Sequence, residues 1–362
     1  MKVAELVRVM EGIAPPQFAA HWDNVGLLVG DPDRDVARVL LTIDCTRSVV
    51  AEAAKGGCGA IVSYHPPIFD GQKRFLAGSV AYEAVRADVA IYSPHTALDV
   101  AEGGTNDVLA DALGMIDRAP LQEIAPPDAE YKLVTFVPEG HVEAVSRAIF
   151  EAGAGRIGKY TSCSFRGQGV GTFFGEDGTN PAVGQSGRFE QASEIRLETV
   201  VSFALVGRVM RALRGAHPYE EPAVDLLRMS SFKRACGFGR IGSVPRASTR
   251  VLIDRVKGAL GVPHVLVASS GDREVTRAAV CAGSGGALVA DAIRAGAEVF
   301  LTGELRHHDA LRAVAAGMSV VCLLHSASER GVLATLQANL SVRCPGVTFE
   351  RSREDRDPFA FA

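Results

Sequence analysis

The sequence predicts an α/β protein in which two related α/β halves form one body and an α+β domain is inserted between them. Strand-like and helix-like segments alternate at both ends of the chain, which favours parallel sheets flanked by helices. The alternation changes in the middle, and a stretch near residue 60 has a counterpart near residue 300. We therefore expect three parts, namely residues 1–125, 126–245 and 246–362.

The N-terminal part opens with an amphipathic helix that ends at Pro15-Pro16. Acidic Glu5 and Glu11 interrupt its apolar residues, whereas a signal peptide would have a continuous apolar stretch. The residue pattern then predicts a strand, a helix and a second strand, at residues 36–43, 48–55 and 60–63. This βαβ order favours a parallel sheet.

The C-terminal part repeats this order. A helix, a strand, a second helix and a second strand are predicted at residues 287–295, 299–302, 308–316 and 319–324. The sequence from Ala54 to His65 resembles the sequence from Arg294 to Thr302, which His307-His308 follow. One such echo suggests that the two halves are related.

The middle of the chain predicts a small ferredoxin-like insert of the PII/CutA type. Two strand-helix-strand units are expected, with strands at 132–137, 197–202 and 223–227 and helices at 142–152 and 206–214. The segment from Gly167 to Gly187 is rich in Gly, Asn, Ser and Pro, which indicates a long loop or an extended hairpin. Linkers are expected at residues 120–128 and 245–249.

Composition excludes several classes of protein. The net charge is -4 with no dense run of Lys and Arg, so we expect no nucleic-acid partner. The seven cysteines include no C-x-x-C pair, which argues against a disulfide framework and against a thiolate zinc site. No run approaches eighteen apolar residues, so we expect no membrane span and a cytoplasmic protein.

Two G-x-G-x-x-G matches, Gly153 to Gly158 and Gly237 to Gly242, do not predict a dinucleotide site. A phosphate-binding loop of that kind leaves a strand and opens a helix. The first match follows a predicted helix and leads into extended sequence, and the second leads toward a predicted linker. We interpret both as turns or close-packing positions.

Candidate metal ligands fall in two clusters at opposite ends of the chain. Tyr64-His65 and His95-x-x-x-Asp99 follow strand-like runs in the first part, and His325-x-x-x-Glu329 follows one in the last part. Either cluster alone is more often structural than metal-binding, but both stand where open α/β sheets place their ligands. His325 and Glu329 lie four residues apart, so on a helix they project from one face and can bind the same ion.

The donor set favours a transition metal. His65, Asp99, His325 and Glu329 offer imidazole and carboxylate ligands, which suit zinc, iron, manganese or nickel better than calcium. Without thiolate ligands, the site suits an exchangeable ion better than a purely structural one. The sequence does not distinguish among these four metals.

With these motifs the chain resembles the Nif-three-like proteins, often labelled GTP cyclohydrolase I type 2 homologues, which form rings around dinuclear metal sites. The resemblance covers essentially the whole chain, insert included. It is carried by residues 22–27, 64–69, 95–99, 103–107, 155–165, 217–222, 303–310, 325–329 and 357–359. It implies a homo-oligomer, with the hexamer as the family habit, and one or two divalent metal ions per chain.

The resemblance implies that His65 and Asp99 bind one metal, that His325 binds a second and that Glu329 bridges both. Tyr64 departs from the family pattern, which has a histidine ligand of the second metal there. A phenol with a pKa near 10 is a poor ligand unless the metal deprotonates it. The second site is therefore expected to be weaker, to hold a harder ion such as iron, or to be empty.

Other polar residues near these motifs have two interpretations each. His95 either compensates for the lost ligand or orients Asp99. Asp23 and Asn24 either support the site or form a turn. Glu304, His307 and His308 either line the cleft or cap the helix that follows them.

The expected function is that of a divalent-metal-binding protein, which as an enzyme would carry out metal-assisted hydrolysis of a nucleotide or a related small molecule. The family label specifies GTP ring opening, but the chain has no G-x-x-x-x-G-K-[ST] loop. The alternatives are a non-catalytic ring that binds or delivers metal, with the insert as a lid or sensor, and a scaffold that engages partner proteins through the insert.

Overall fold

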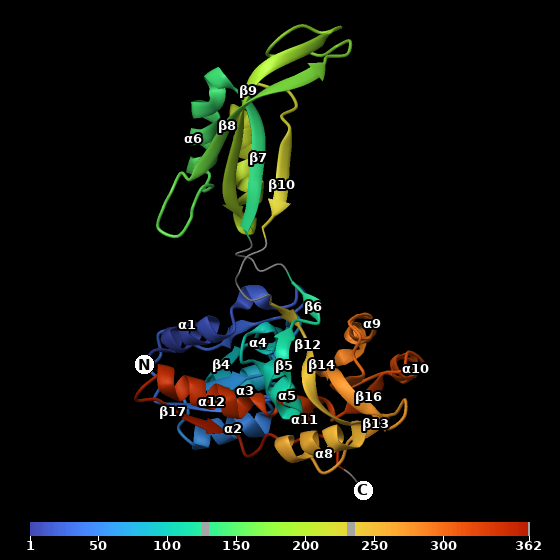
Figure 1. Cartoon of the computed structure of the whole chain (residues 1–362). Helices are drawn as coiled ribbons and strands as arrows, with labels where there is room; N and C mark the ends of the chain where they lie inside the picture. Colours follow the sequence, from blue (N-terminus) through green and yellow to red (C-terminus); the bar gives the residue numbers. More distant parts are fainter. Residues whose placement is uncertain (125–129, 230–235, 361–362) are drawn as a thin grey trace. The chain divides into compact units, whose positions relative to one another are not determined.

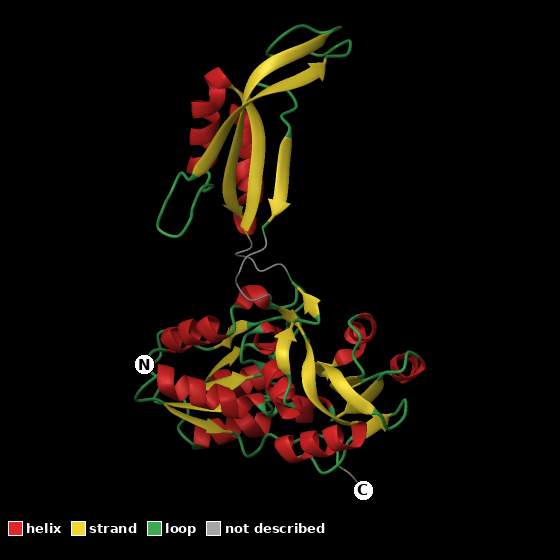
Figure 2. Ribbon diagram, viewed as in Figure 1, coloured by secondary structure: helices red, strands yellow, loops and turns green. Residues whose placement is uncertain are grey.

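The computed structural model describes residues 1–124, 130–229 and 236–360, which form a mixed α/β fold with several sheets (Figures 1 and 2). The chain divides into two compact units. One is formed by Met1–Ile124 together with Ala235–Ala362, and the other by Ala125–Arg234. Within the described residues, no helix is long and apolar enough to cross a bilayer.

The first sheet of the larger unit has five strands in the order β1-β4-β3-β2-β17. Four of them pair in parallel, and β1 runs antiparallel to β4. The strands are β1 (Gly26–Val29), β2 (Arg38–Thr42), β3 (Ala60–Ser63), β4 (Ala90–Ser93) and β17 (Thr348–Arg351).

Both faces of this sheet are covered, so its central strands read as continuous apolar runs. Leu41 on β2 belongs to one core cluster, with α1 (Val3–Ile13) and α12 (Val332–Arg343). Leu40 belongs to another, with α2 (Arg47–Lys55) and α3 (Val80–Arg86). The predicted helix before Pro15-Pro16 and the predicted elements at 36–63 are confirmed within one or two residues.

The second sheet has six strands in the order β13-β16-β15-β14-β12-β5, with β14, β15 and β16 parallel. Helices α8 (Thr249–Leu260), α9 (Val289–Arg294) and α10 (His307–Ala315) flank it, and β6 (Gln122–Glu123) pairs separately with β11 (Gly237–Phe238). The strands are β5 (Ile116–Ala119), β12 (Arg240–Ser248), β13 (Leu266–Ala268), β14 (Glu274–Ser284), β15 (Val299–Glu304) and β16 (Ser319–Cys322).

The two sheets exchange elements from opposite ends of the chain. From the N-terminal part, α5 (Thr105–Leu113) packs into the core of the second sheet, and β5 joins that sheet. From the C-terminal part, α12 packs into the core of the first sheet, and β17 pairs with β2. Residues 1–125 and 246–362 therefore do not each form a sheet of their own.

The smaller unit contains a four-stranded antiparallel sheet in the order β10-β7-β9-β8. Its helices α6 (Val142–Glu151) and α7 (Val206–Ala216) contribute to a single apolar core with β7 and β9. The strands are β7 (Glu130–Pro138), β8 (Ser164–Phe174), β9 (Phe189–Ser202) and β10 (Val224–Arg228). The segment from Gly167 to Gly187 forms most of a long hairpin, one of the two predicted alternatives (Figure 1).

Two sequence expectations concern the junctions between the parts. The linker predicted at 245–249 is wrong, because β12 continues to Ser248 and α8 begins at Thr249. Pro245 fits within β12 because the pairing with β14 shifts register between Ser243 and Ala247. The predicted domain end at residue 245 thus falls inside β12, whereas residues 125–128 of the other predicted linker lie outside the described residues.

The glycine motifs behave as turns and close contacts. Residues 153–158 follow α6 and lead toward β8, and residues 237–242 span β11 and the start of β12. Neither opens a helix as a dinucleotide loop does, and the second leads into β12 instead of the predicted linker.

Replacing Leu340 on α12 with alanine should destabilise the larger unit, because this fully buried side chain packs α12 into the core of the first sheet. We expect the free energy of unfolding to fall by about 2–5 kcal/mol, as measured by urea denaturation followed by circular dichroism. Val342→Ala on the same helix, where the side chain is 83% exposed, is the control and should change stability by less than about 0.5 kcal/mol. Equal effects of the two substitutions would contradict the exchange of elements as a source of stability.

Candidate metal centre

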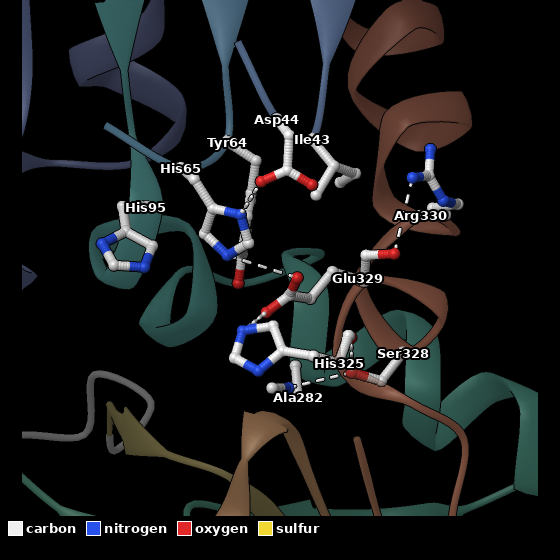
Figure 3. Close-up of polar contacts among 12 residues, drawn as sticks. Ile43, Asp44, Tyr64, His65, His95, Ala282, His325, Ser328, Glu329 and Arg330 are labelled. Atoms are coloured by element: carbon white, nitrogen blue, oxygen red, sulfur yellow. Dashed lines mark hydrogen bonds and ion pairs between the residues drawn. The ribbon is translucent and has the colours of Figure 1, made fainter. Parts of the chain in front are cut away.

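The candidate site lies where strands of the two sheets in the larger unit end, with side chains from both ends of the chain converging (Figure 3). Asp44 follows β2, Tyr64 and His65 follow β3, and His95 follows β4. From the second sheet, His325 follows β16. This placement agrees with the rule that open α/β sheets carry their sites at the carboxyl ends of their strands.

Three of the four predicted ligands come together. His65, His325 and Glu329 each offer a ligand atom, and these atoms lie within 4.8 Å of one another. The two oxygens of Glu329 face different imidazoles: Oε1 lies 3.3 Å from Nε2 of His325, and Oε2 lies 3.4 Å from Nε2 of His65. Glu329 is only 2% exposed, and among the described residues its Oε2 has no hydrogen-bond partner.

Each imidazole is hydrogen-bonded to a carboxylate through Nδ1, the nitrogen that points away from Glu329. Nδ1 of His65 lies 2.9 Å from Oδ1 of Asp44, and Nδ1 of His325 lies 3.1 Å from Oε1 of Glu304. Because each Nδ1–H donates to a carboxylate, each Nε2 is turned toward Glu329. Metal-binding histidines are commonly oriented in this way.

The short helix α11 (His325–Glu329) sets the spacing of the C-terminal ligands, as the sequence predicts. Leu324, the residue before it, has φ of +76°, an unusual conformation for leucine that is retained only where surrounding contacts enforce it. Ser326 Oγ donates to Asp357 at 2.6 Å, and Arg330 pairs with buried Asp355 at 2.9 Å. The C-terminal tail thus fixes both ends of α11.

Gly283, near the end of β14, forms the floor below this cluster. A Cβ at this position would lie 2.8 Å from Oε1 of Glu329 and 3.3 Å from Nε2 of His325. Its φ of +60° also favours glycine. Any other residue would fill the space between the candidate ligands.

Asp99, the fourth predicted ligand, stands outside this group of three. Its Oδ1 accepts a short hydrogen bond from the Tyr64 hydroxyl; Tyr64 is buried and Asp99 is partly buried. Asn106 stabilises the backbone at Asp99. Its Nδ2 donates to the Asp99 carbonyl at 2.9 Å, and its Oδ1 accepts from the Ala282 backbone at 2.9 Å. Asn106 thereby links the candidate ligand on α4 (His95–Val100) to β14 of the second sheet.

His95 pairs with Asp23 and makes no hydrogen bond to Asp99 among the described residues. Its Nδ1 lies 2.7 Å from Oδ1 of Asp23, and the other oxygen of this carboxylate, Oδ2, accepts from the Thr96 backbone at 3.1 Å. Its ring packs at 5.3 Å from that of His65. Asp23 therefore supports the site rather than only forming a turn, and His95 is positioned by Asp23 instead of orienting Asp99.

Burial and pairing shift the protonation of the cluster. Burial disfavours the charged form of His65, but its hydrogen bond to Asp44 and its ion pairing with Glu329 outweigh this and raise its pKa to about 10. The hydrogen bond to Glu329 likewise raises the pKa of His325 to about 9, against the effect of burial. Burial opposes ionisation of Glu329, but both imidazoles lower its pKa. Without a metal, the cluster therefore holds protons on its histidines.

The environment of Asp99 and Tyr64 favours their uncharged forms, whereas that of the two histidines favours the charged form. Burial and the charge of Glu329 raise the pKa of Asp99 to about 6, although the hydrogen bond from Tyr64 works against this. Burial, together with the charges of Asp99 and Glu329, raises the pKa of Tyr64 well above its ordinary value. The phenol is therefore a proton donor to Asp99 in this structure.

The sequence predicted some of the residues that surround the candidate ligands and did not predict others. Glu304 contacts the cluster, whereas His307 and His308 pack on each other and contribute no ligand atom to the group of three. Asp44 was missed, although it directly follows a predicted strand, which is the signal that identified His65. Gly283 and Asp355 carried no sequence signal, because their roles depend on contacts far along the chain.

The model of the Duf34/NIF3 (NGG1p interacting factor 3) family matches residues 1–358. Proteins named GTP cyclohydrolase 1 type 2 homolog are similar along their whole length: the one from Halalkalibacterium halodurans is 35% identical, with 100% of both chains covered, and the one from Bacillus subtilis is 34% identical, with 99% and 98% covered. A crystal structure of a Bacillus cereus protein related to NIF3 matches with a TM-score of 0.69 at 33% identity, covering 100% of this chain and 99% of that one. A Staphylococcus aureus structure matches with a TM-score of 0.76 at 28% identity over the same shares.

The pKa shifts predict how the stability of the metal-free protein depends on pH. The folded-state pKa values of His65 and His325, about 10 and about 9, lie above the ordinary value of 6.5. Their contribution is therefore fully present below pH 6.5 and is lost as the pH rises through the folded values. Urea denaturation in the presence of a chelator should give a free energy of unfolding that falls between these limits. Glu329→Gln should weaken the dependence, and a parent protein whose stability rises with pH over this range would contradict the assignment.

Proposed function

The chain belongs to the Duf34/NIF3 family, and from that premise we propose that it binds one or two divalent metal ions and uses them in the hydrolysis of a nucleotide or a related small molecule. The observation that carries the proposal is the Glu329 carboxylate, which is buried and turns one oxygen toward each of His65 and His325. A carboxylate in this position is suited to bridge two ions. The candidate ligands are His65, Asp99, His325 and Glu329.

The residues present fit a metal ion in three respects. The buried Oε2 of Glu329 has no hydrogen-bond partner among the described residues, which is costly unless another group satisfies it. Gly283 leaves open the space that a side chain would fill. The imidazole and carboxylate donors suit zinc, iron, manganese or nickel.

Tyr64 makes the two proposed sites unequal. The site at His65 gains the second carboxylate, Asp99, whose Oδ1 is already occupied by the Tyr64 hydroxyl. The site at His325 has Glu329 but no counterpart of the missing histidine. We therefore propose that the first site binds more tightly and that Tyr64 supports Asp99 instead of binding metal itself.

In this proposal the protein side chains orient the metal ligands and set the protonation states around the centre. A bound divalent ion would lower the pKa of a coordinated water toward ~7 and polarise the electrophile. Asp44 and Glu304 keep both Nε2 atoms directed at the centre. The hydrogen bond from Tyr64 to Asp99 lies next to the cluster, and Glu329, with its lowered pKa, stays ionised and could hold the ions.

The substrate class rests on the names of the relatives, which are called GTP cyclohydrolase 1 type 2 homologs. Nucleotides, GTP among them, are therefore the first substrates to test. The second candidate function is a non-catalytic ring that binds or delivers metal, and the replacement of a family ligand by Tyr64 favours it. In either case we propose that the chain self-associates, with the hexamer as the expected form.

Metal content per chain, measured by elemental mass spectrometry on tag-free protein, tests the metal assignment. We expect one tightly bound ion with partial occupancy of a second, loss of both in Glu329→Gln, and nearly two ions in Tyr64→His, because an imidazole replaces the phenol. Glu350→Gln is the matched control, since this carboxylate lies on β17 and pairs with Arg38, and it should retain the parent content. Full metal content in Glu329→Gln would refute the site.

Turnover of GTP and other nucleotides by metal-loaded parent and Tyr64→His proteins separates the two functions. A two-metal hydrolase predicts turnover that increases with the occupancy of the second site. A binding or delivery protein predicts no turnover in either protein, although both hold metal.

A further inference from the structure

The smaller unit contains a pocket of its own, with a volume of about 650 Å³. This volume lies within the range of about 300–1,000 Å³ that is typical of small-molecule sites. The pocket lies against the β8–β9 hairpin and the turn before β10, and every residue that lines it belongs to residues 136–223. It shares no residue with the candidate metal centre, and the inference drawn from it does not depend on the proposed function of that centre.

Glycine forms the floor of this pocket. Gly169 and Gly171 both line the pocket and lie two residues apart on β8, so they face the same side of the sheet. A Cβ on Gly171 would overlap the carboxylate of Glu194 on the neighbouring strand, whereas a Cβ on Gly169 would meet nothing within 4 Å. The strand thereby makes room for one carboxylate and leaves open space beside it.

Two loop segments form the walls. Residues 179–183, from the tip of the hairpin, and residues 219–221, from the turn before β10, both line the pocket. The Asn180 backbone donates to Oε2 of Glu220 at 3.1 Å, which ties the walls together. The apolar lining includes Phe136, Phe173, Pro181 and Val183.

Glu194 is the chemically notable group in this pocket. It is only 8% exposed, and its Oε1 accepts a hydrogen bond of 2.6 Å from the Tyr219 hydroxyl. No Lys, Arg or His forms an ion pair with it among residues 130–229. Buried carboxylates are normally paired with a cation, so this one is short of a positive partner.

Neither of the nearby basic residues supplies that charge. His217 accepts from the Tyr219 backbone at Nδ1 and donates from Nε2 to the Phe136 carbonyl, which describes the neutral ring, and burial lowers its pKa. Arg196 donates to Glu198 at 2.7 Å and lies over the Phe136 ring. Glu220 and Glu221 also line the pocket, so its lining has three acidic residues and one basic residue, Arg196.

We propose that this pocket binds a small amphipathic organic cation, with an ammonium group on Glu194 and an aromatic or aliphatic body over the glycine floor. The ammonium group would donate to the Glu194 carboxylate and supply the positive charge that this carboxylate lacks. The apolar body would cover Phe136, Phe173 and Val183. Recognition of this kind is specific for charge, since a neutral molecule of the same shape leaves the carboxylate unpaired.

Binding of 2-phenylethylammonium to the full chain, measured by calorimetry and ligand-observed NMR at neutral pH, tests this proposal. We expect saturable binding that is about tenfold or more tighter than that of 2-phenylethanol, which has the same ring and no charge. Glu194→Gln should remove this preference and leave the weak binding of the alcohol unchanged. Gly169→Val should weaken the binding of both molecules, because the valine side chain enters the open space of the pocket without displacing protein atoms.

Glu151→Gln is the matched control, because this exposed residue on α6 does not line the pocket, and it should bind the amine as the parent does. Circular dichroism and metal content serve to show that each variant remains folded. Equal binding of amine and alcohol by the parent, or an unchanged amine affinity in Glu194→Gln, would overturn the proposal. So would the absence of saturable amine binding, or a Gly169→Val variant that changes its oligomeric state while still binding the amine.

Discussion

The larger unit depends on one constraint, which is that a buried carboxylate must stand between two imidazoles that come from opposite ends of the chain. Glu329 satisfies this by turning one oxygen to His65 and the other to His325. Charged groups of this kind are costly to bury unless they are paired. The neighbouring structure therefore serves to hold the three side chains in place. The tail residues Asp355 and Asp357 fix α11, and Gly283 leaves the space beneath it open.

The exchange of elements between the two sheets provides the rigidity that this arrangement needs. His65 follows a strand of the first sheet, and Glu329 lies on a helix that follows a strand of the second. If the two sheets could shift against each other, the distance between these ligands would vary. The insertion of α5 and β5 into one core and of α12 and β17 into the other prevents this, and Asn106 adds a direct polar link. The stability of the body and the geometry of the site thus have a common origin.

Sequence patterns predicted those parts of the structure that depend on local spacing. The i, i+4 relation of His325 and Glu329 gave the helix face they share, and the end of each strand-like run gave the position of His65. The exchange of β5 and β17 was not predictable, since strand periodicity does not specify which sheet a strand joins. The hydrogen bond from Tyr64 to Asp99 was missed for a similar reason. The resemblance implied that Tyr64 stands where the family has a histidine ligand, but only the structure shows that its hydroxyl hydrogen-bonds to an oxygen of another candidate ligand. The unpaired Glu194 also emerges only from the fold, because an acidic residue in a strand sequence gives no sign of burial.

Anomalous diffraction from crystals of the metal-loaded protein, recorded on both sides of the absorption edge of the bound metal, is the most direct test of the central claim. The account predicts a strong peak between Nε2 of His65 and the Glu329 carboxylate, and a weaker peak or none beside Nε2 of His325. A metal found elsewhere in the chain, with Glu329 still held between two protonated histidines, would contradict it.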